Sequence, residues 1–123
     1  MIFDSLSNKV IGCALEVHRE LGPGLLESTY EACLAHELSR AGLKFALQFP
    51  MPVAYKTVRL DCGYRLDIIV EDELILELKA VDEVQGIHEA QLLTYLKLAG
   101  KKTGLWINFN VPVLKHGIRR FVL

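Results

Sequence analysis

The sequence predicts a single α/β domain, spanning residues 1–123, in which helices pack against a mixed β-sheet. Three segments repeat apolar residues at helical spacing, and runs of apolar and β-branched residues bounded by turn residues lie between and after them. A chain of 123 residues is also long enough to bury one core of its own. The order helix, helix, strands, helix, strand, strand is typical of helices laid against a sheet.

Each predicted helix has a recognisable start or stop. Ser7 can cap the first helix, whose apolar stripe ends at the "GPG" of residues 22–24. The second begins near Glu27 and ends at Gly42, a residue suited to the left-handed end of a helix. The third covers about residues 86–98 and is followed by "AGKKTG".

Strand character is found in four successive segments and in two more after the third helix. These segments are residues 44–49, 53–60, 64–70, 74–81, 105–109 and 117–123. Short turns separate the first four, and strands joined by short turns pair in the antiparallel sense. We therefore expect antiparallel neighbours along this part of the chain.

Composition indicates a soluble globular protein with no membrane segment. The content is 51% hydrophobic and 24% charged, and no apolar run approaches the roughly 20 residues of a membrane helix. The first ten residues, "MIFDSLSNKV", lack the features of a secretory signal. Cys13, Cys33 and Cys62 are widely spaced and contain no CxxC pair. We expect buried thiols and a cytoplasmic location.

Charge gives a weaker indication of partners. The formal net charge is −1, which counts against a protein that coats nucleic acid but leaves local contact open. Basic residues gather in the C-terminal part: Lys97, Lys101, Lys102, Lys115, Arg119 and Arg120. This cluster could form a phosphate-facing edge or an ordinary solvated surface.

The candidate chemistry lies in "YRLDIIVEDELILELKAV", residues 64–81. Alternation along a strand places Glu77 and Lys79 on one face. A turn near residues 71–73 makes residues whose numbers sum to about 144 face one another, so Asp67 would oppose Glu77. Two opposed carboxylates are destabilising without a cation, which predicts a role for Lys79, a metal ion, or both.

Two carboxylates and a lysine suit phosphodiester hydrolysis. Mg²⁺ prefers oxygen ligands and retains waters, which it can activate as nucleophiles while it neutralises phosphate charge. The alternative is a cross-strand cluster of salt bridges with no chemical role.

Motifs along most of the chain resemble a known superfamily. "LD", nine further residues and "ELK" resemble the signature of the PD-(D/E)XK nucleases, with a leucine in place of the proline. "GLLESTY", with Gly24, Glu27 and Tyr30, resembles the pattern that names the GxxExxY family of that superfamily. "VHRELGPG", "YRLDIIV", "HEAQLLTYLKLAG" and "GLWINF" are similar to further blocks of this family.

The resemblance implies a restriction-endonuclease-like αβββαβ core, with a mixed sheet flanked by helices, and a divalent-metal site. Mg²⁺ or Mn²⁺ would be held by Asp67, Glu77, the carbonyl of Leu78 and Glu27, the last on an inward stripe with Tyr30. Lys79 would act on the attacking water, and Gln91 would support Lys79 or contact the phosphate. The residues expected around this site are Tyr30, Tyr95 and His88; His88 is either a proton carrier or an ordinary solvated histidine at the start of a helix.

The function that the resemblance implies is metal-dependent hydrolysis of nucleic acid that leaves a 5′-phosphate, with DNA favoured over RNA as the substrate. One rival is a non-catalytic module of nuclease-like fold that binds a protein or nucleic-acid partner, which the near-zero net charge favours. A hydrolase of another phosphate ester would use the same site. A homodimer is also expected if both strands of a duplex are cut, because that needs two active sites.

Overall fold

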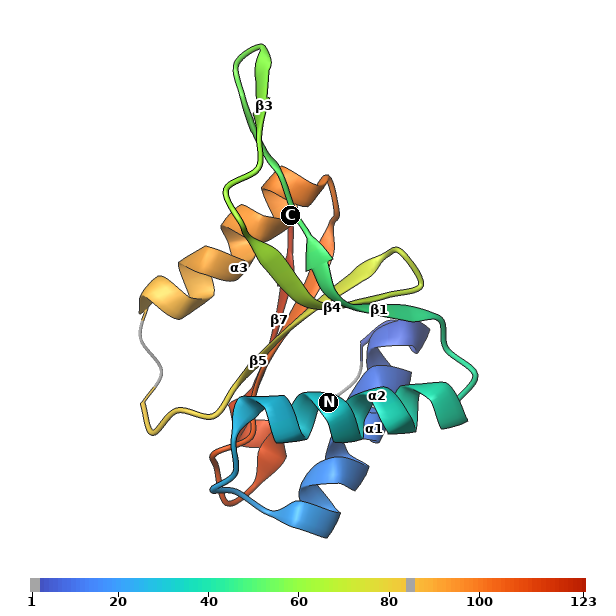
Figure 1. The fold of residues 1–123 in the computed structure, drawn as a ribbon. Helices are drawn as coiled ribbons and strands as arrows, with labels where there is room; N and C mark the ends of the chain where they lie inside the picture. The colour runs from blue at the N-terminus through green and yellow to red at the C-terminus, as the bar shows by residue number, and fades with distance from the viewer. Residues whose placement is uncertain (1–2, 84–85) are drawn as a thin grey trace.

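The computed structural model describes residues 3–83 and 86–123, which form a five-stranded sheet with helices on both faces (Figure 1). Helices α1 and α2 cover one face, and α3 covers the other. The elements in chain order are α1 (Ser5–Leu21), α2 (Glu27–Arg40), β1 (Phe45–Pro50), β2 (Val53–Tyr55), β3 (Val58–Leu60), β4 (Arg65–Val70), β5 (Leu74–Lys79), α3 (Gly86–Ala99), β6 (Thr103–Asn108), the 3₁₀-helix η1 (Leu114–Gly117) and β7 (Ile118–Val122). The predicted α/β class and restriction-endonuclease-like fold are confirmed.

The sheet is mixed, with strand order β1-β4-β5-β6-β7. The pairs β1–β4, β4–β5 and β6–β7 are antiparallel, whereas β5 and β6 are parallel. A parallel pair needs a long crossover, which α3 supplies between β5 and β6. Strand β4 pairs with β1 because the intervening segment leaves the sheet.

That intervening segment corrects the prediction of one strand over residues 53–60. Val53–Tyr55 and Val58–Leu60 form a separate antiparallel hairpin that projects beyond the sheet (Figure 1). The chain reverses at Lys56, where φ is 54°. Two-residue hairpin turns usually use asparagine or glycine at such positions, so "YKTV" reads as uninterrupted strand.

The cap of α1 also differs from the prediction. Asp4, rather than Ser7, is the capping residue, and its carboxylate accepts hydrogen bonds from the Ser7 N–H at 3.0 Å and the Ser7 hydroxyl at 2.7 Å. These bonds to Ser7, with a smaller contribution from Arg120, lower the pKa of Asp4 to about 2. Ser7 lies within the first turn and is buried.

The core is divided by the sheet into two clusters. Leu76 and Leu78 of β5 pack with α1 and α2 on one face, and Ile75 and Trp106 pack with α3 on the other. The alternation of β5 therefore places Glu77 and Lys79 on the α3 face.

The cysteine prediction is wrong in its burial. Cys13 and Cys33 are half-buried and Cys62 is exposed; all three are free thiols. Cys62 lies in the exposed loop before β4, where no core reaches it. None of the helices in the described part of the chain is both long enough and apolar enough to span a membrane.

Candidate active site

The hairpin of β4 and β5 sets the position of the two carboxylates. Glu71 and Asp72 both have positive φ, 52° and 54°, and the Glu73 N–H donates to the Val70 carbonyl at 3.0 Å, which closes a tight turn. The register pairs Ile68 with Leu76 and Val70 with Leu74. These numbers sum to 144, which confirms the predicted register.

Asp67 and Glu77 lie just beyond the last hydrogen-bonded pair of β4 and β5. Each side chain accepts a hydrogen bond from the main chain of the opposite strand. The Leu78 N–H donates to Asp67 Oδ2 at 2.8 Å. The Asp67 N–H donates to Glu77 Oε1 across a longer 3.4 Å. Side-chain bonds thus take over where the pairing of β4 with β5 ends, and they hold both acids in place.

Glu77 is an unusual buried acid. Its side chain is 4% exposed, and burial followed by the neighbouring charge of Asp67 raises its pKa to about 8. The Asp67 N–H and the charge of Lys79 act in the opposite direction. At neutral pH Glu77 therefore retains its proton until a cation compensates its charge.

Lys79 is half-buried on the same face of β5 as Glu77. Its main chain is fixed by the sheet, since the Lys79 carbonyl accepts from the Phe109 N–H at 2.9 Å. The predicted juxtaposition of Asp67, Glu77 and Lys79 is therefore present in the structure.

A small cavity of about 130 Å³ opens beside Asp67 on the α2 side. Glu27, Ser28, Glu31, Gln48, Asp67 and Leu78 line it. Glu27 is exposed at the mouth of this cavity, which corrects the expectation of an inward-facing acid. It begins α2 at the edge of the molecule, and Tyr30 is the first residue of that helix to be buried.

Glu31 and Gln48 are cavity residues that the sequence reasoning missed. The Gln48 side-chain amide donates to Glu31 Oε1 at 2.6 Å. Glu31 follows Glu27 by one helical turn, a spacing that could have identified it. Gln48 carries no such signal.

The strand backbone is irregular around Asp67. Leu66 packs on the α3 face and Ile68 on the opposite face, although residues two apart normally share a face. On the neighbouring strand Gln48 has φ of 49°, between Leu47, paired with Ile68, and Phe49, paired with Leu66. With this kink at Gln48, the Asp67 carboxylate reaches the Leu78 N–H and the cavity, while the Asp67 N–H bonds Glu77.

Helix α3 brings Gln91 and Tyr95 to the other side of Glu77. The Gln91 amide donates to the Tyr95 hydroxyl at 2.9 Å, and this bond, rather than one to Lys79, is the contact found. Burial raises the pKa of Tyr95. The hydrogen bond from Gln91 lowers this pKa, and the charges of Glu77 and Asp67 raise it further. Tyr95 therefore lies within the field of both carboxylates.

His88 and Tyr30 contact groups other than the two carboxylates. His88 stacks on Trp106 with ring centroids 6.2 Å apart. The Tyr30 hydroxyl donates to the Gly22 carbonyl at 2.6 Å and accepts from the Leu25 N–H at 3.2 Å. Tyr30 thus fixes the turn that starts α2 and so positions Glu27.

The donor set fits a hard divalent cation. Across the described ranges, 3–83 and 86–123, no group of three or more His, Cys, Asp and Glu residues is close enough to hold a metal ion alone. Asp67, Glu77 and the Leu78 carbonyl supply oxygen donors, and Mg²⁺ is commonly bound by one or two carboxylates with waters completing its shell. A cation would also compensate the buried charge of Glu77.

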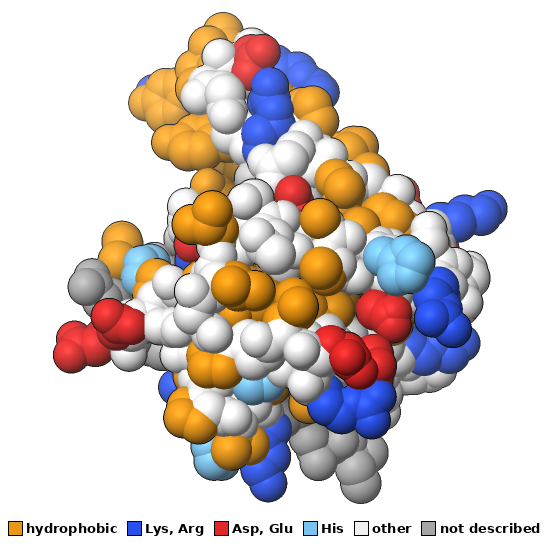
Figure 2. All heavy atoms as spheres, turned by 60° about the horizontal axis from the view of Figure 1, so that its bottom comes forward, with side chains coloured by type: hydrophobic (Ala, Val, Ile, Leu, Met, Phe, Trp, Pro, Cys, Tyr) orange, Lys and Arg blue, Asp and Glu red, His pale blue; other side chains and the backbone are white. Residues whose placement is uncertain are grey.

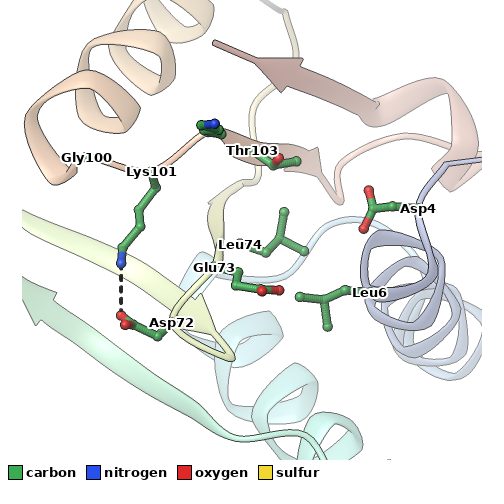
Figure 3. A pocket seen from close by; sticks show the side chains of 9 residues that line it. Asp4, Leu6, Asp72, Glu73, Leu74, Gly100, Lys101 and Thr103 are labelled. Carbon is green, nitrogen blue, oxygen red and sulfur yellow. Dashed lines mark ion pairs between the residues drawn. The ribbon is translucent and has the colours of Figure 1, made fainter.

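A larger hollow of about 450 Å³ lies at the opposite end of β5, beside Asp4, Asp72 and Lys101 (Figure 3). Lys101 pairs there with Asp72 at 3.2 Å, and the Asp72 side chain is 85% exposed. Both charges are already balanced at the surface, and neither is buried. This hollow therefore lacks the features that distinguish the Asp67 and Glu77 pair.

The C-terminal basic residues do not act as one group. Three of the six are paired with acids: Lys101 with Asp72, Arg119 with Glu89, and Arg120 with Asp4. On the face drawn in Figure 2, basic side chains lie in separate groups, and one group adjoins acidic side chains. The reading as a solvated surface is favoured for these three residues over a phosphate-facing edge.

Comparison with known proteins agrees with this geometry. A sequence model of the PD-(D/E)XK nuclease superfamily matches residues 4–121, a range that contains every candidate site residue. Neither the curated proteins nor the solved structures provide a match. The finer resemblance to the GxxExxY family stays a prediction.

Proposed function

The chain belongs to the PD-(D/E)XK nuclease superfamily, and we propose that it is a metal-dependent nuclease that hydrolyses phosphodiester bonds of DNA. The observation that carries the proposal is the buried Glu77 carboxylate beside Asp67, with Lys79 on the same strand face. Burying an acid next to a second acid costs stability unless a cation compensates it. A catalytic metal site accounts for that cost.

Four groups would hold Mg²⁺ or Mn²⁺: Asp67, Glu77, the carbonyl of Leu78, and Glu27 from the cavity mouth. When bound, the ion would lower the pKa of a water and offset the charge of the phosphate. Glu27 is free to move toward the ion because its side chain is exposed.

Lys79 would orient the attacking water or steady the negative charge that develops on the phosphoryl oxygens. The water oxygen forms a bond to phosphorus as the bond to the 3′-oxygen breaks, and the product keeps a 5′-phosphate. Tyr95, held by Gln91, would shield Glu77 from solvent and keep its carboxylate oriented. His88 is proposed as the proton carrier for the departing oxygen.

A second candidate is a non-catalytic module that binds a protein or nucleic-acid partner. Two observations favour this module. The described residues contain no preformed cluster of three metal-binding side chains, and Lys101, Arg119 and Arg120 are already paired with acids. Metal binding separates the two functions, because a module without chemistry has no need of an ion at Asp67. GxxExxY membership, a cytoplasmic location and a homodimer are further parts of the proposal.

The test is cleavage of labelled single- and double-stranded DNA and RNA in Mg²⁺, Mn²⁺ or EDTA. Native protein should cut in the presence of metal, and Asp67→Ala and Lys79→Ala should each lose about 10²-fold or more in rate. Asp72→Ala and Lys101→Ala are matched controls, because they remove an acid in the β4–β5 turn and the lysine before β6 that pairs with it, both away from the proposed site. Both should cut like the native protein.

Cutting that persists in Asp67→Ala and Lys79→Ala would reject the proposed site. If the native chain binds Mg²⁺ but cuts none of the four nucleic acids, another phosphate ester becomes the expected substrate. If it neither binds metal nor cuts, the non-catalytic module replaces the nuclease.

A further inference from the structure

A second cavity, of about 480 Å³, lies on the α3 side of the sheet, the face on which Glu77 and Lys79 project. Nine residues line this cavity. Three of them are apolar residues with no further role here, and the other six are Tyr64, Ile87, His88, Gln91, Thr94 and Tyr95. Lys, Arg, Asp and Glu are all missing from the nine residues that line it. The cavity therefore suits an uncharged ligand with apolar faces.

Side chains that line this cavity lie close to Glu77: His88 stacks on Trp106, which is the register partner of Glu77 in the sheet. Tyr95 lines the cavity, is only 8% exposed, and lies in the electrostatic field of Glu77 and Asp67. Gln91, which also lines the cavity, fixes the Tyr95 hydroxyl by a 2.9 Å hydrogen bond. A group seated here would lie next to a phosphate at the carboxylates.

We propose that this cavity binds an unpaired nucleobase of the strand whose phosphate lies at Asp67 and Glu77. This inference rests on the proposed nuclease function and names its substrate class: nucleic acid that is single-stranded, frayed or flipped out at the cleavage site.

Aromatic surface is the first reason for a base. Tyr64 is 45% exposed, and its ring meets that of Tyr95 edge-on, with centroids 6.0 Å apart. The accessible face of Tyr64 is a platform on which a base of any sequence can stack. Ile87, 68% exposed, adds apolar surface at the same cavity.

Polar groups at the cavity suit the edge of a base. Gln91 and Thr94 offer an amide and a hydroxyl. Nδ1 of His88 is buried and has no hydrogen-bond partner among the described residues, so a hydrogen bond from the edge of a base would satisfy it. A phosphate would find no cation here, so the uncharged part of a nucleotide fits better than its backbone.

An intact duplex cannot supply such a base without breaking a pair. Unstacking and unpairing cost a few kcal/mol, and the cost is lowest where the base is already unpaired. The enzyme should therefore prefer single strands, flaps or ends over continuous duplex.

The first test measures the Kd for a labelled single-stranded oligonucleotide in Mg²⁺ by fluorescence anisotropy, with Lys79→Ala in every variant to prevent cutting. Loss of one stacking platform predicts binding about 5- to 100-fold weaker for Tyr64→Ala. Tyr64→Phe keeps the ring and should bind within about twofold. Tyr55→Ala is the matched control, since it removes a tyrosine that is 58% exposed and lies outside the cavity.

The second test places a single abasic nucleotide at each position flanking the cleaved phosphate. At one of these positions, the missing base should lower kcat/KM of the native protein by about 5- to 100-fold, as the loss of Tyr64 is expected to weaken binding. In Tyr64→Ala the same abasic substrate should cause little further loss, because the two changes remove one shared interaction.

Several outcomes would overturn the inference: unchanged binding by Tyr64→Ala, an equal loss in Tyr55→Ala, or abasic losses that persist undiminished in Tyr64→Ala. Unchanged nucleic-acid binding would instead assign the cavity to an apolar protein segment. The binding test needs no cleavage, so a chain that fails to cut yet binds through Tyr64 refutes only the nuclease function. A chain that cuts without dependence on Tyr64 refutes only the base cavity.

Discussion

The Glu77 carboxylate accepts a 3.4 Å hydrogen bond from the main-chain N–H of Asp67, the residue whose own carboxylate lies beside it. Asp67 in turn accepts a 2.8 Å bond from the N–H of Leu78. Each acid is therefore positioned by the strand that carries the other. These two proposed metal ligands are held in place by the protein itself, which is the arrangement that preorganised catalysis requires.

Replacement of Glu77 by glutamine should stabilise the protein at alkaline pH. The pKa of Glu77 is about 8 in the folded state and 4.5 ordinarily, so between these values only the unfolded chain releases the proton. Native stability should fall as pH rises from about 5 to 8 and then level off. Glu77→Gln removes this dependence and should be more stable at pH 9 by on the order of 2–4 kcal/mol.

Urea unfolding at pH 5, 7 and 9 in EDTA measures this difference. Glu73→Gln is the control, because Glu73 is an exposed acid on the same hairpin. Equal pH profiles for native protein and Glu77→Gln would show that Glu77 titrates normally.

Metal binding should release a proton. Below pH 8 Glu77 holds a proton that an incoming Mg²⁺ or Mn²⁺ must displace. Calorimetry at pH 6.5 in two buffers of different ionisation enthalpy should give about one proton per ion, and the number should decline toward zero above pH 8. Asp67→Ala should abolish binding, while Asp72→Ala keeps it. Binding with no proton release at pH 6.5 would place the ion away from Glu77.

Local chemistry was enough to predict the centre of the site. The acidic turn before β5 set a register in which Asp67 faces Glu77, and strand alternation put Lys79 with them. These relations depend on neighbours in sequence and on the period of a strand, so they can be read without tertiary structure. The spacing of "LD" and "ELK" carries the same information.

The surroundings of the site depended on tertiary contacts and were harder to predict. The reversal at Lys56 has no glycine or asparagine to announce it, and the positive φ of Gln48 falls in an ordinary strand sequence. Glu27 lies on the same stripe as Tyr30, yet only the packing of α2 shows that the first turn of this helix, including Glu27, is exposed. Tyr64 opens the block "YRLDIIV", but that block does not indicate a cavity, which forms because α3 crosses beside Tyr64.

The kink at Gln48 should be sensitive to the shape of the side chain. A φ of 49° costs little for glycine and much for a β-branched residue. Gln48→Gly should stay within about 1 kcal/mol of native stability, although it loses the bond to Glu31. Gln48→Val should lose about 1–3 kcal/mol and bind metal several-fold more weakly, because the strand straightens and turns Asp67 away.

Urea unfolding and Mg²⁺ calorimetry check this pair of variants. Leu47→Val is the control, since it introduces valine on the same exposed strand at a residue without positive φ. If Gln48→Val and Leu47→Val bind metal equally well, the kink does not position Asp67.

Asn108 should support Lys79 without contributing to metal binding. Its buried side chain accepts hydrogen bonds from the N–H groups of Val81 at 3.0 Å and Asn110 at 3.2 Å, and donates to the Val81 carbonyl at 2.9 Å. It thereby ties the chain just after Lys79 to the end of β6, where Lys79 and Asn108 are register partners.

Asn108→Ala leaves these main-chain groups without their partner and should cost about 1–3 kcal/mol of stability. The freed segment should let Lys79 shift, so kcat is expected to fall about tenfold while the Mg²⁺ affinity, set by Asp67 and Glu77, changes less than threefold. Asn110→Ala is the control, because its amide bonds Asp82 in a more exposed position, at 2.7 Å. Unfolding, cleavage kinetics and calorimetry on the same preparations decide the matter: an equal loss of metal affinity and kcat in Asn108→Ala would mean that Asn108 holds the whole hairpin end rather than the lysine.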